Sequence, residues 1–450
     1  MTRAYLGIDI GTTRTKALLY DAAESRVLAS SSLPTPVKHS SEGDLRDPDA
    51  VVEVTAAVSA RVLREYPADV AGVSVASVGE EIVLVDATGL STGTTPAWYT
   101  VESALSPEGP THAEATWHKL SSIARKHPDR ITASRSFTDI AGYVSSRLTG
   151  DHVTDAGGFS PLSMDRSHAS RTGFYDPTTE QWDLQRFDRL GLPRELLPTL
   201  VSSGTVIART SGEISANHGL HPDVPIVAGG HDHFCGAFGA GVRSTGDIYI
   251  SVGTSESQIV LVDYLSDELR EAGIDVGTYV DARHAYLHIA SASGREFDAA
   301  VRDTEFTDSI DDLYRRMEVL MDSTHLSGER RANNIDLTVR PILQLLHDQA
   351  DRAADRIDRL LTLAGRSDGR VFVGGSPASQ PLWRQIRRAA SAVPLTFLRE
   401  PELSALGAAL LAQFAVEGIA PSPPAVTYSE GAAHGISGGM SVSPAGVRAE

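Results

Sequence analysis

Cysteine and long apolar runs are almost missing from this 450-residue chain, and each shortage excludes a class of protein. The single cysteine, Cys235, excludes an internal disulfide framework and any multi-cysteine metal site. No apolar run approaches the roughly 20 residues that span a bilayer, and no signal-peptide pattern follows Met1. We therefore expect a cytoplasmic protein.

Positive charge is also in short supply, since the formal net charge is −18. Long-range repulsion would oppose nucleic acid or an anionic membrane, so we expect neither as a partner. A small anion stays compatible, because a few oriented amides and one cation can outweigh the global field. Lysine is rare, and Lys16 stands at the end of a Gly-Thr-Thr turn, which makes it a cation of interest.

The length and the apolar and charged fractions of 41% and 22% are typical of a globular protein with two domains. Strand-like runs surround one predicted helix at 47–66, and a second cycle of strand and helix begins near residue 247. We expect helices over much of 111–150, an irregular stretch at 151–225, and further helices at 335–364, 382–392 and 403–417. This pattern predicts an α/β fold with mixed sheets covered by helices.

Two Gly-Thr turns follow apolar strands. In the first, strand 5–10 carries Asp9 at its tip, and Gly11 lets backbone amides face an anion. The second is Gly253-Thr254, after strand 248–252. No Gly-Lys-Ser/Thr precedes a helix here, which excludes a P-loop. The pair suggests two similar domains facing one nucleotide, and an ordinary tight turn in a core sheet stays an alternative.

The densest polar cluster is 228–241, after a predicted strand at 224–227. Asp232 comes just past the strand end, where α/β proteins usually place chemistry, and we favour it as a general base. Two alternatives stay open: a metal site made by His231, His233 and Cys235, and a purely structural turn. The glycines favour a turn, in which the two histidines would not share a side.

Three weaker signals have two readings each. Gly374-Gly375 follows strand 371–373 and either approaches a ligand or marks close backbone packing. Glu80 and Glu81 follow a predicted strand and either bind sugar hydroxyls or are exposed loop acids. Trp98 either stacks on a sugar ring or fills the core.

Taken together and in order, five motifs resemble the FGGY family of carbohydrate kinases. They are Asp9-Ile-Gly-Thr-Thr13, Gly229-Gly-His-Asp232, Ser251-Val-Gly-Thr254, Gly374-Gly375 and Glu402-Leu-Ser-Ala-Leu-Gly-Ala408. The resemblance implies two actin-like ATPase (ribonuclease-H-like) domains with the nucleotide and sugar in the cleft between them. Residues 1–242 would form the N-terminal domain with the sugar site and the base, 243–425 the C-terminal ATP-binding domain, and 426–450 a flexible tail.

The resemblance also implies a role for each matching residue. Asp232 would be the catalytic base and Asp9 would position Mg²⁺. The triphosphate would lie against Gly11, Thr12, Thr13, Lys16, Gly253 and Thr254, the adenosine against Gly374, Gly375 and Gln385, and the sugar against Glu80, Glu81, Trp98, His231 and Asp232. The implied cofactors are ATP and Mg²⁺, the partners are the sugar and ATP, and a homodimer stays open.

The departures from the family concern the acceptor. Glu80 replaces the usual sugar-contact residue, the segment after Trp98 lacks the usual acid and arginine, and the Gly-rich loop expected after Arg330 is missing. We expect a xylulokinase-like enzyme that phosphorylates a primary hydroxyl of a small ketose, a pentulose or hexulose. A glycerol- or erythritol-type polyol kinase is an alternative, since Glu80 matches an acidic polyol contact of glycerol kinases. A catalytically weak sugar- or nucleotide-binding regulator is another.

Overall fold

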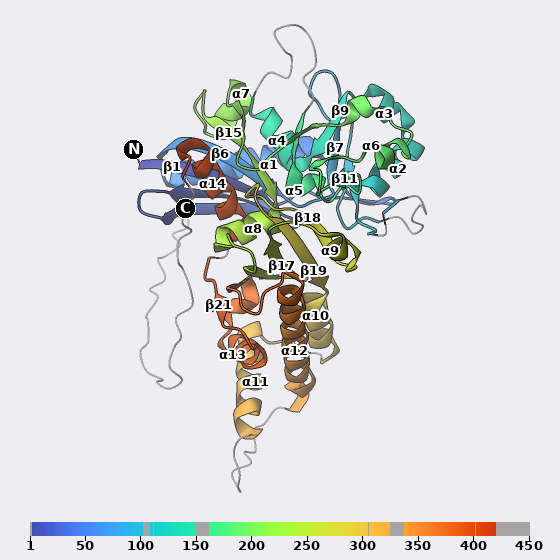
Figure 1. Cartoon of the computed structure of the whole chain (residues 1–450). Helices are drawn as coiled ribbons and strands as arrows, with labels where there is room; N and C mark the ends of the chain where they lie inside the picture. The colour runs from blue at the N-terminus through green and yellow to red at the C-terminus, as the bar shows by residue number, and fades with distance from the viewer. Residues whose placement is uncertain are drawn as a thin grey trace.

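The computed structural model describes residues 2–101, 109–110, 112–149, 162–304, 306–324, 337–400 and 402–419. Two six-stranded sheets organise these residues, in the orders β14-β15-β6-β1-β2-β3 and β18-β19-β17-β16-β20-β21. The first sheet lies in the upper part of Figure 1, and helices α10 to α13 extend below the second. The expected tail at 426–450 and the segment around Arg330 lie outside the described residues.

The first sheet is built around a hairpin. Its strands are β1 (Thr2–Ile10), β2 (Arg14–Asp21), β3 (Arg26–Pro34), β6 (Ala68–Ser77), β14 (Val206–Arg209) and β15 (Pro225–His231). β1 pairs antiparallel with β2 and parallel with β6. Residues alternate between the two faces of a strand, so Leu6 and Ile8 enter one core while Tyr5 enters the other.

Helices cover both faces of this sheet. α1 (Pro48–Glu65) and α4 (Ile140–Arg147) pack on one face, and α8 (Asp232–Ala240) and α14 (Leu403–Glu417) on the other. α1 confirms the helix predicted at 47–66: the Asp47 side chain accepts from the amide of Asp49, and Pro48 opens the first turn. Such a cap contributes about 1 kcal/mol.

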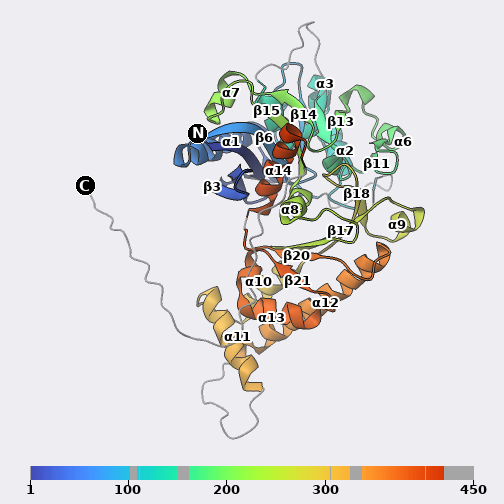
Figure 2. The ribbon, with the colours of Figure 1, turned by 60° about the vertical axis from the view of Figure 1, so that its left-hand side comes forward.

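The last described helix returns to the first sheet, although the sequence places it in a domain at 243–425. α14 packs on β1, β6 and α8 in both views (Figure 2). Glycine makes the close approach possible, because a Cβ on Gly7 would lie 1.9 Å from the carbonyl oxygen of Ala405. A Cβ on Gly407 would lie 1.8 Å from the carbonyl oxygen of Cys235, on α8. By its packing, α14 belongs with the first sheet.

The second sheet repeats the hairpin of the first. Its strands are β16 (Ile248–Val252), β17 (Glu256–Val262), β18 (Asp275–Thr278), β19 (Ala285–Ser291), β20 (Val371–Gly374) and β21 (Leu395–Phe397). β16 pairs antiparallel with β17 and parallel with β20, as β1 does with β2 and β6. Its helices are α10 (Ser293–Asp303), α11 (Ile310–Thr324), α12 (Arg340–Leu363) and α13 (Pro381–Ala390). The predicted α/β fold with two related sheets is confirmed.

Shorter elements complete the described chain. The strands are β4 (Lys38–Ser40), β5 (Gly43–Arg46), β7 (Ile82–Val85), β8 (Thr95–Pro96), β9 (Ser136–Asp139), β10 (Ser163–Asp165), β11 (Tyr175–Asp176), β12 (Gln181–Trp182) and β13 (Thr199–Val201). The helices are α2 (Thr116–Lys126), α3 (Pro128–Ala133), α5 (Arg166–Ala169), α6 (Leu184–Asp188), α7 (Gly212–Asn217) and α9 (Asp267–Glu271), with 3₁₀ turns at Arg194–Leu196, Leu337–Val339 and Ser376–Ser379. None of the helices in the described ranges is long and apolar enough to cross a membrane.

Candidate active site

The alternation of side chains along β1 and β2 places an acidic residue, Asp9, beside a basic one, Lys16. Asp9 follows Tyr5 and Gly7 on the face that α14 covers, and Lys16 stands opposite Asp9 in the hairpin register. The Lys16 Nζ atom is 3.7 Å from Asp9 Oδ2 and 2.7 Å from Glu402 Oε2, where α14 begins. Two adjacent strands and a helix from the far end of the described chain therefore place two carboxylates around one ammonium group.

Asp9 has the properties of a cation ligand. Its side chain is buried, and its Oδ1 atom has no hydrogen-bond partner. Burial raises the pKa of Asp9 to about 7, although Lys16 opposes the rise and the charges of Asp232 and Glu402 add to it. A buried carboxylate oxygen without a partner suits a hard divalent cation, which would repay its desolvation. The donor set fits the metal that the sequence assigns to Asp9.

The side chains of Arg46 and Trp98 hold the Gly11–Thr13 turn in place. Arg46 donates from Nη2 to the carbonyl oxygen of Thr12 at 2.6 Å, and its Nε lies 3.2 Å from Glu81 Oε1. The indole Nε1 of Trp98 donates to Thr12 Oγ1 at 2.8 Å, and the Trp98 amide donates to Glu81 Oε1 at 3.1 Å. Glu81 is only 1% exposed, and its carboxylate pairs with Arg46 and so helps to fix the Gly11–Thr13 turn. Its expected contact with the sugar stays a prediction.

Asp232 opens α8 at the end of β15. The glycines before it belong to the strand and not to the predicted turn, because a Cβ on Gly229 would lie 2.0 Å from the carbonyl oxygen of Val75 in β6. The Asp232 Oδ1 atom lies 2.8 Å from His231 Nδ1 and accepts from the amide of His233 at 2.7 Å. Burial alone would raise the Asp232 pKa, but the His233 and His231 imidazoles lower it well below its usual value. The carboxylate is therefore ionised at neutral pH.

Cys235 does not join the two histidines. It is fully buried in the core between α8 and α14, so the alternative set of His231, His233 and Cys235 as metal ligands is wrong. The structure brings one ligand atom each of His231, Asp232 and His233 within 4.8 Å of one another instead.

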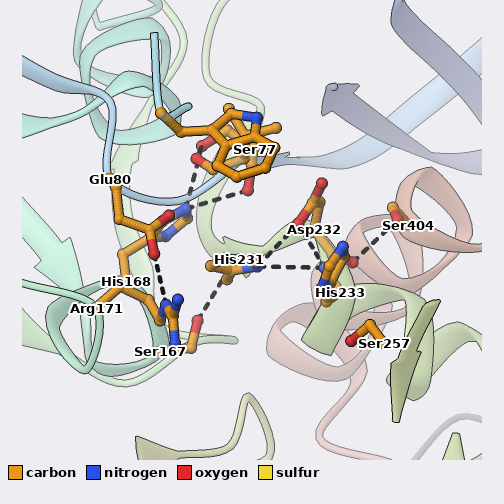
Figure 3. A network of polar contacts seen from close by, with 12 residues as sticks. Ser77, Glu80, Ser167, His168, Arg171, His231, Asp232, His233, Ser257 and Ser404 are labelled. Atoms are coloured by element: carbon orange, nitrogen blue, oxygen red, sulfur yellow. Dashed lines mark hydrogen bonds and ion pairs between the residues drawn. The ribbon is translucent and has the colours of Figure 1, made fainter. Parts of the chain in front are cut away.

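Glu80 stands beside this cluster in a strained backbone conformation, with φ of 60°. Arg171 donates from Nε to Glu80 Oε1 at 2.6 Å (Figure 3). Its Nη1 lies 2.9 Å from Asp275 Oδ2 in β18 of the second sheet. Burial would raise the Glu80 pKa, but Arg171 and neighbouring cations hold it below its usual value. Arg171 is missed at the sequence level, because it lies in a stretch with no regular pattern and outside every motif.

A second network holds His231 in place. The Ser167 hydroxyl accepts from the His231 amide at 2.9 Å and donates to Asp165. Asp165 also contacts the buried imidazole of His168, which lies 3.8 Å from Asp139. Burial would lower the His168 pKa, but these two carboxylates raise it to about 10, so His168 is a cation at neutral pH. The network thus fixes the end of β15 next to Asp232.

The second Gly-Thr turn, Gly253-Thr254, lines one side of a cavity of about 500 Å³ in the second half of the chain. Its lining includes Gly253, Thr254, Gly294, Phe297, Tyr314, Ser376, Gln380, Trp383 and Arg387. Its volume suits a nucleoside, and its aromatic side chains provide stacking surfaces. Gln385 is exposed and does not line it, since α13 turns Trp383 and Arg387 inward. If this cavity takes the adenosine, Gln385 lies outside it, and the expected contact of Gln385 with adenosine stays a prediction.

Gly374 and Gly375 also lie outside the lining. A Cβ on Gly375, whose φ is 114°, would lie 1.9 Å from the carbonyl oxygen of Val252. A Cβ on Gly374 would lie 2.8 Å from Leu403. Close backbone packing, the second reading of this motif, describes both glycines, and Ser376 and Pro377 after them reach the cavity.

The described chain thus combines two related six-stranded sheets, each with a Gly-Thr turn after the first strand of its hairpin, and a nucleoside-sized cavity beside the second turn. The N-terminal domain of the FGGY family of carbohydrate kinases matches residues 4–103 and 109–239. The chain belongs to this family, whose members are phosphotransferases with an alcohol group as acceptor.

The curated relatives that this chain is similar to include two carbohydrate kinases. A xylulose kinase of Streptomyces coelicolor is 27% identical over 90% of this chain and 86% of its own length. A gluconokinase of Bacillus licheniformis is 23% identical over 58% of this chain and 53% of its own length.

Solved structures share the fold. A xylulose kinase from Brucella ovis has a TM-score of 0.79 at 20% identity, covering 95% of this chain and 94% of that one. A Plasmodium falciparum glycerol kinase with ADP has a TM-score of 0.75 at 16% identity, covering 93% and 90%.

Proposed function

We propose that the chain transfers the γ-phosphoryl group of ATP, with Mg²⁺, to a primary hydroxyl of a small uncharged ketose. The observation that carries the proposal is the ionised Asp232 carboxylate at the start of α8, beside the fixed carboxylate of Glu80. Asp232 accepts the proton of the attacking hydroxyl, a step that is worth about 10²- to 10⁴-fold in rate.

Positioning and charge neutralisation supply the rest of the catalysis. The amides of Gly11 to Thr13 and of Gly253 and Thr254 would hold the phosphates from two sides. Asp9 would hold the metal, with Lys16 beside it, and the bound Mg²⁺ would neutralise charge on the phosphates. The cavity lined by Phe297 and Tyr314 would take the adenosine.

The charges around the acceptor favour a neutral sugar. Glu80, Asp232 and Asp275 are acids, and Arg171 is shared between two of them. A carboxylate on the substrate, as in an aldonate, would be repelled by this surplus of negative charge. The hydroxyl groups of a neutral sugar instead donate hydrogen bonds to carboxylates. The similarity to a xylulose kinase over 90% of this chain supports a ketose over an aldonate, because the gluconokinase similarity covers 58%.

A polyol such as glycerol is the second candidate acceptor, because Glu80 places a fixed carboxylate at the acceptor site. A coupled assay of ADP release with Mg²⁺ separates the candidates, using D-xylulose, D-ribulose, D-fructose, glycerol, erythritol and gluconate. A ketose with the highest kcat/KM supports the proposal. A faster reaction with glycerol or gluconate contradicts it, and silence over the panel with intact ATP binding supports a regulator.

A further inference from the structure

Two imidazoles flank the base, and the proposed phosphoryl transfer leaves one of them, His233, without a task. Figure 3 shows His231, Asp232 and His233 turned toward one another. The ring centroids of the two histidines are 5.4 Å apart, and His231 Nδ1 lies 2.8 Å from Asp232 Oδ1. One possible ligand atom each of His231, Asp232 and His233 lies within 4.8 Å of the other two.

The fold holds these side chains before any ligand arrives. His231 ends β15 and caps α8, and Ser167 fixes its amide. Its ring occupies the space that a side chain at position 79 would need, since a Cβ on Gly79 would lie 2.6 Å from His231 Nε2. His233 sits in the first turn of α8, and its ring packs edge-on against His288, 6.1 Å away.

Two imidazole nitrogens and one carboxylate oxygen form a donor set for Zn²⁺ or Co²⁺, with a position left for water. Mg²⁺ prefers oxygen ligands, so this set discriminates against it.

Within the described ranges one other such group occurs, made by Asp139, Asp165 and His168. It is fully buried, and its imidazole is protonated and bound by the acids. That group is therefore not available to a metal.

We propose that His231, Asp232 and His233 form a binding site for a borderline-soft divalent cation such as Zn²⁺, separate from the Mg²⁺ site at Asp9. The cation would occupy the Asp232 carboxylate and so inhibit phosphoryl transfer. The inhibition rests on the proposed function, whereas the binding does not.

Binding is tested on the full chain, without an affinity tag and stripped of metal, by titration with Zn²⁺ against a chromophoric chelator. His233→Asn is compared with His39→Asn, because His39 also pairs with an acid, Asp44, at 2.6 Å but on the exposed surface. We expect His233→Asn to lower Zn²⁺ affinity at least tenfold and His39→Asn to leave it unchanged.

Co²⁺ provides an independent readout, because its visible absorption reports coordination at the site. We expect tetrahedral-type bands in the parent chain and in His39→Asn, and their loss in His233→Asn and Asp232→Asn. Melting temperatures near that of the parent chain show that the variants are folded. Zn²⁺ affinity and Co²⁺ bands that are the same in all four proteins would overturn the proposal.

Inhibition is measured with Zn²⁺ at a fixed excess of Mg²⁺ and ATP, with each rate relative to the same protein without Zn²⁺. We expect His233→Asn to need at least tenfold more Zn²⁺ for half inhibition than His39→Asn. Equal sensitivity would show that Zn²⁺ acts elsewhere and would overturn the inhibitory role. If no acceptor is phosphorylated, the proposed function fails, while the two binding measurements still decide the metal site.

Discussion

Lys16 in the first hairpin and Glu402 at the start of α14 form an ion pair of 2.7 Å, although 386 positions separate them in the chain. Lys16 also lies 3.7 Å from Asp9, so Glu402 determines how the ammonium group is shared between two acids. α14 thus contributes an acid to the surroundings of Asp9 and Lys16, where we propose that the metal and phosphates bind.

Replacing Glu402 by Gln should therefore impair the metal and phosphate site without unfolding the chain. We expect an increase of about tenfold in the KM for Mg·ATP, because Lys16 then pairs with Asp9 alone and competes with the metal. Glu65→Gln makes the same change at an exposed acid at the end of α1 and is a control away from the site. An unchanged KM for Mg·ATP in Glu402→Gln would contradict this role.

Metal binding at Asp9 should release protons near neutral pH. The pKa of free Asp9 is raised to about 7, so the carboxyl is partly protonated at pH 7 and must ionise to bind a cation. Mg²⁺ affinity should therefore rise from pH 6 to pH 8 and then level off. Calorimetry of Mg²⁺ and a non-hydrolysable ATP analogue, in buffers of different ionisation enthalpy, measures the release. Asp9→Asn should release fewer protons than the parent chain when Mg²⁺ binds. Equal proton release in the two proteins would exclude Asp9 as the source.

Arg171 joins the acceptor site to the second sheet, since it contacts both Glu80 and Asp275. Arg171→Met leaves the buried Glu80 carboxylate without its guanidinium partner, whereas the half-exposed Asp275 keeps His288 at 3.3 Å, and we expect the free energy of unfolding to fall by about 3 kcal/mol. Arg171→Lys keeps the charge but can hold only one acid well, so its main effect should be a higher KM for the sugar with little change in the KM for ATP. Urea unfolding and steady-state kinetics check these effects, and equal increases in both KM values would contradict them.

Two substitutions, one of a residue that lines the cavity and one of a residue outside it, test whether this cavity binds the adenosine. Phe297 lines the cavity, and Phe297→Ala should weaken ATP binding about tenfold because a stacking surface is lost. Gln385 is exposed outside the cavity, so Gln385→Ala should bind ATP like the parent chain. Equilibrium binding of a fluorescent ATP analogue measures both, and a larger loss in Gln385→Ala would exclude this cavity as the adenosine site.

The strongly patterned parts of the sequence predict the fold well. The hairpin ending at Asp21, the helix after Asp47 and the strand leading to Asp232 follow from alternation, capping and apolar runs. Their period also explains why Asp9 and Lys16 share a face.

Long-range contacts could not be predicted in this way. Arg171 has no local signal, and its two acidic partners lie 91 and 104 residues away. Glu81 is an acid of the kind that binds sugar hydroxyls, but in the structure its carboxylate pairs with Arg46. Gln385 lies on the exposed side of α13. The return of α14 to the first sheet depends on small residues in four different elements, which become meaningful only when they meet.

The central claim is that Asp232 takes the proton of the acceptor hydroxyl, and Asp232→Asn tests it most directly. The measurement is ADP formation that depends on the best acceptor, together with ATP affinity in the same preparation. The account predicts a fall in kcat of about 10²- to 10⁴-fold, with ATP affinity unchanged within about twofold. An Asp232→Asn protein that turns over at nearly the parent rate would remove Asp232 from the mechanism.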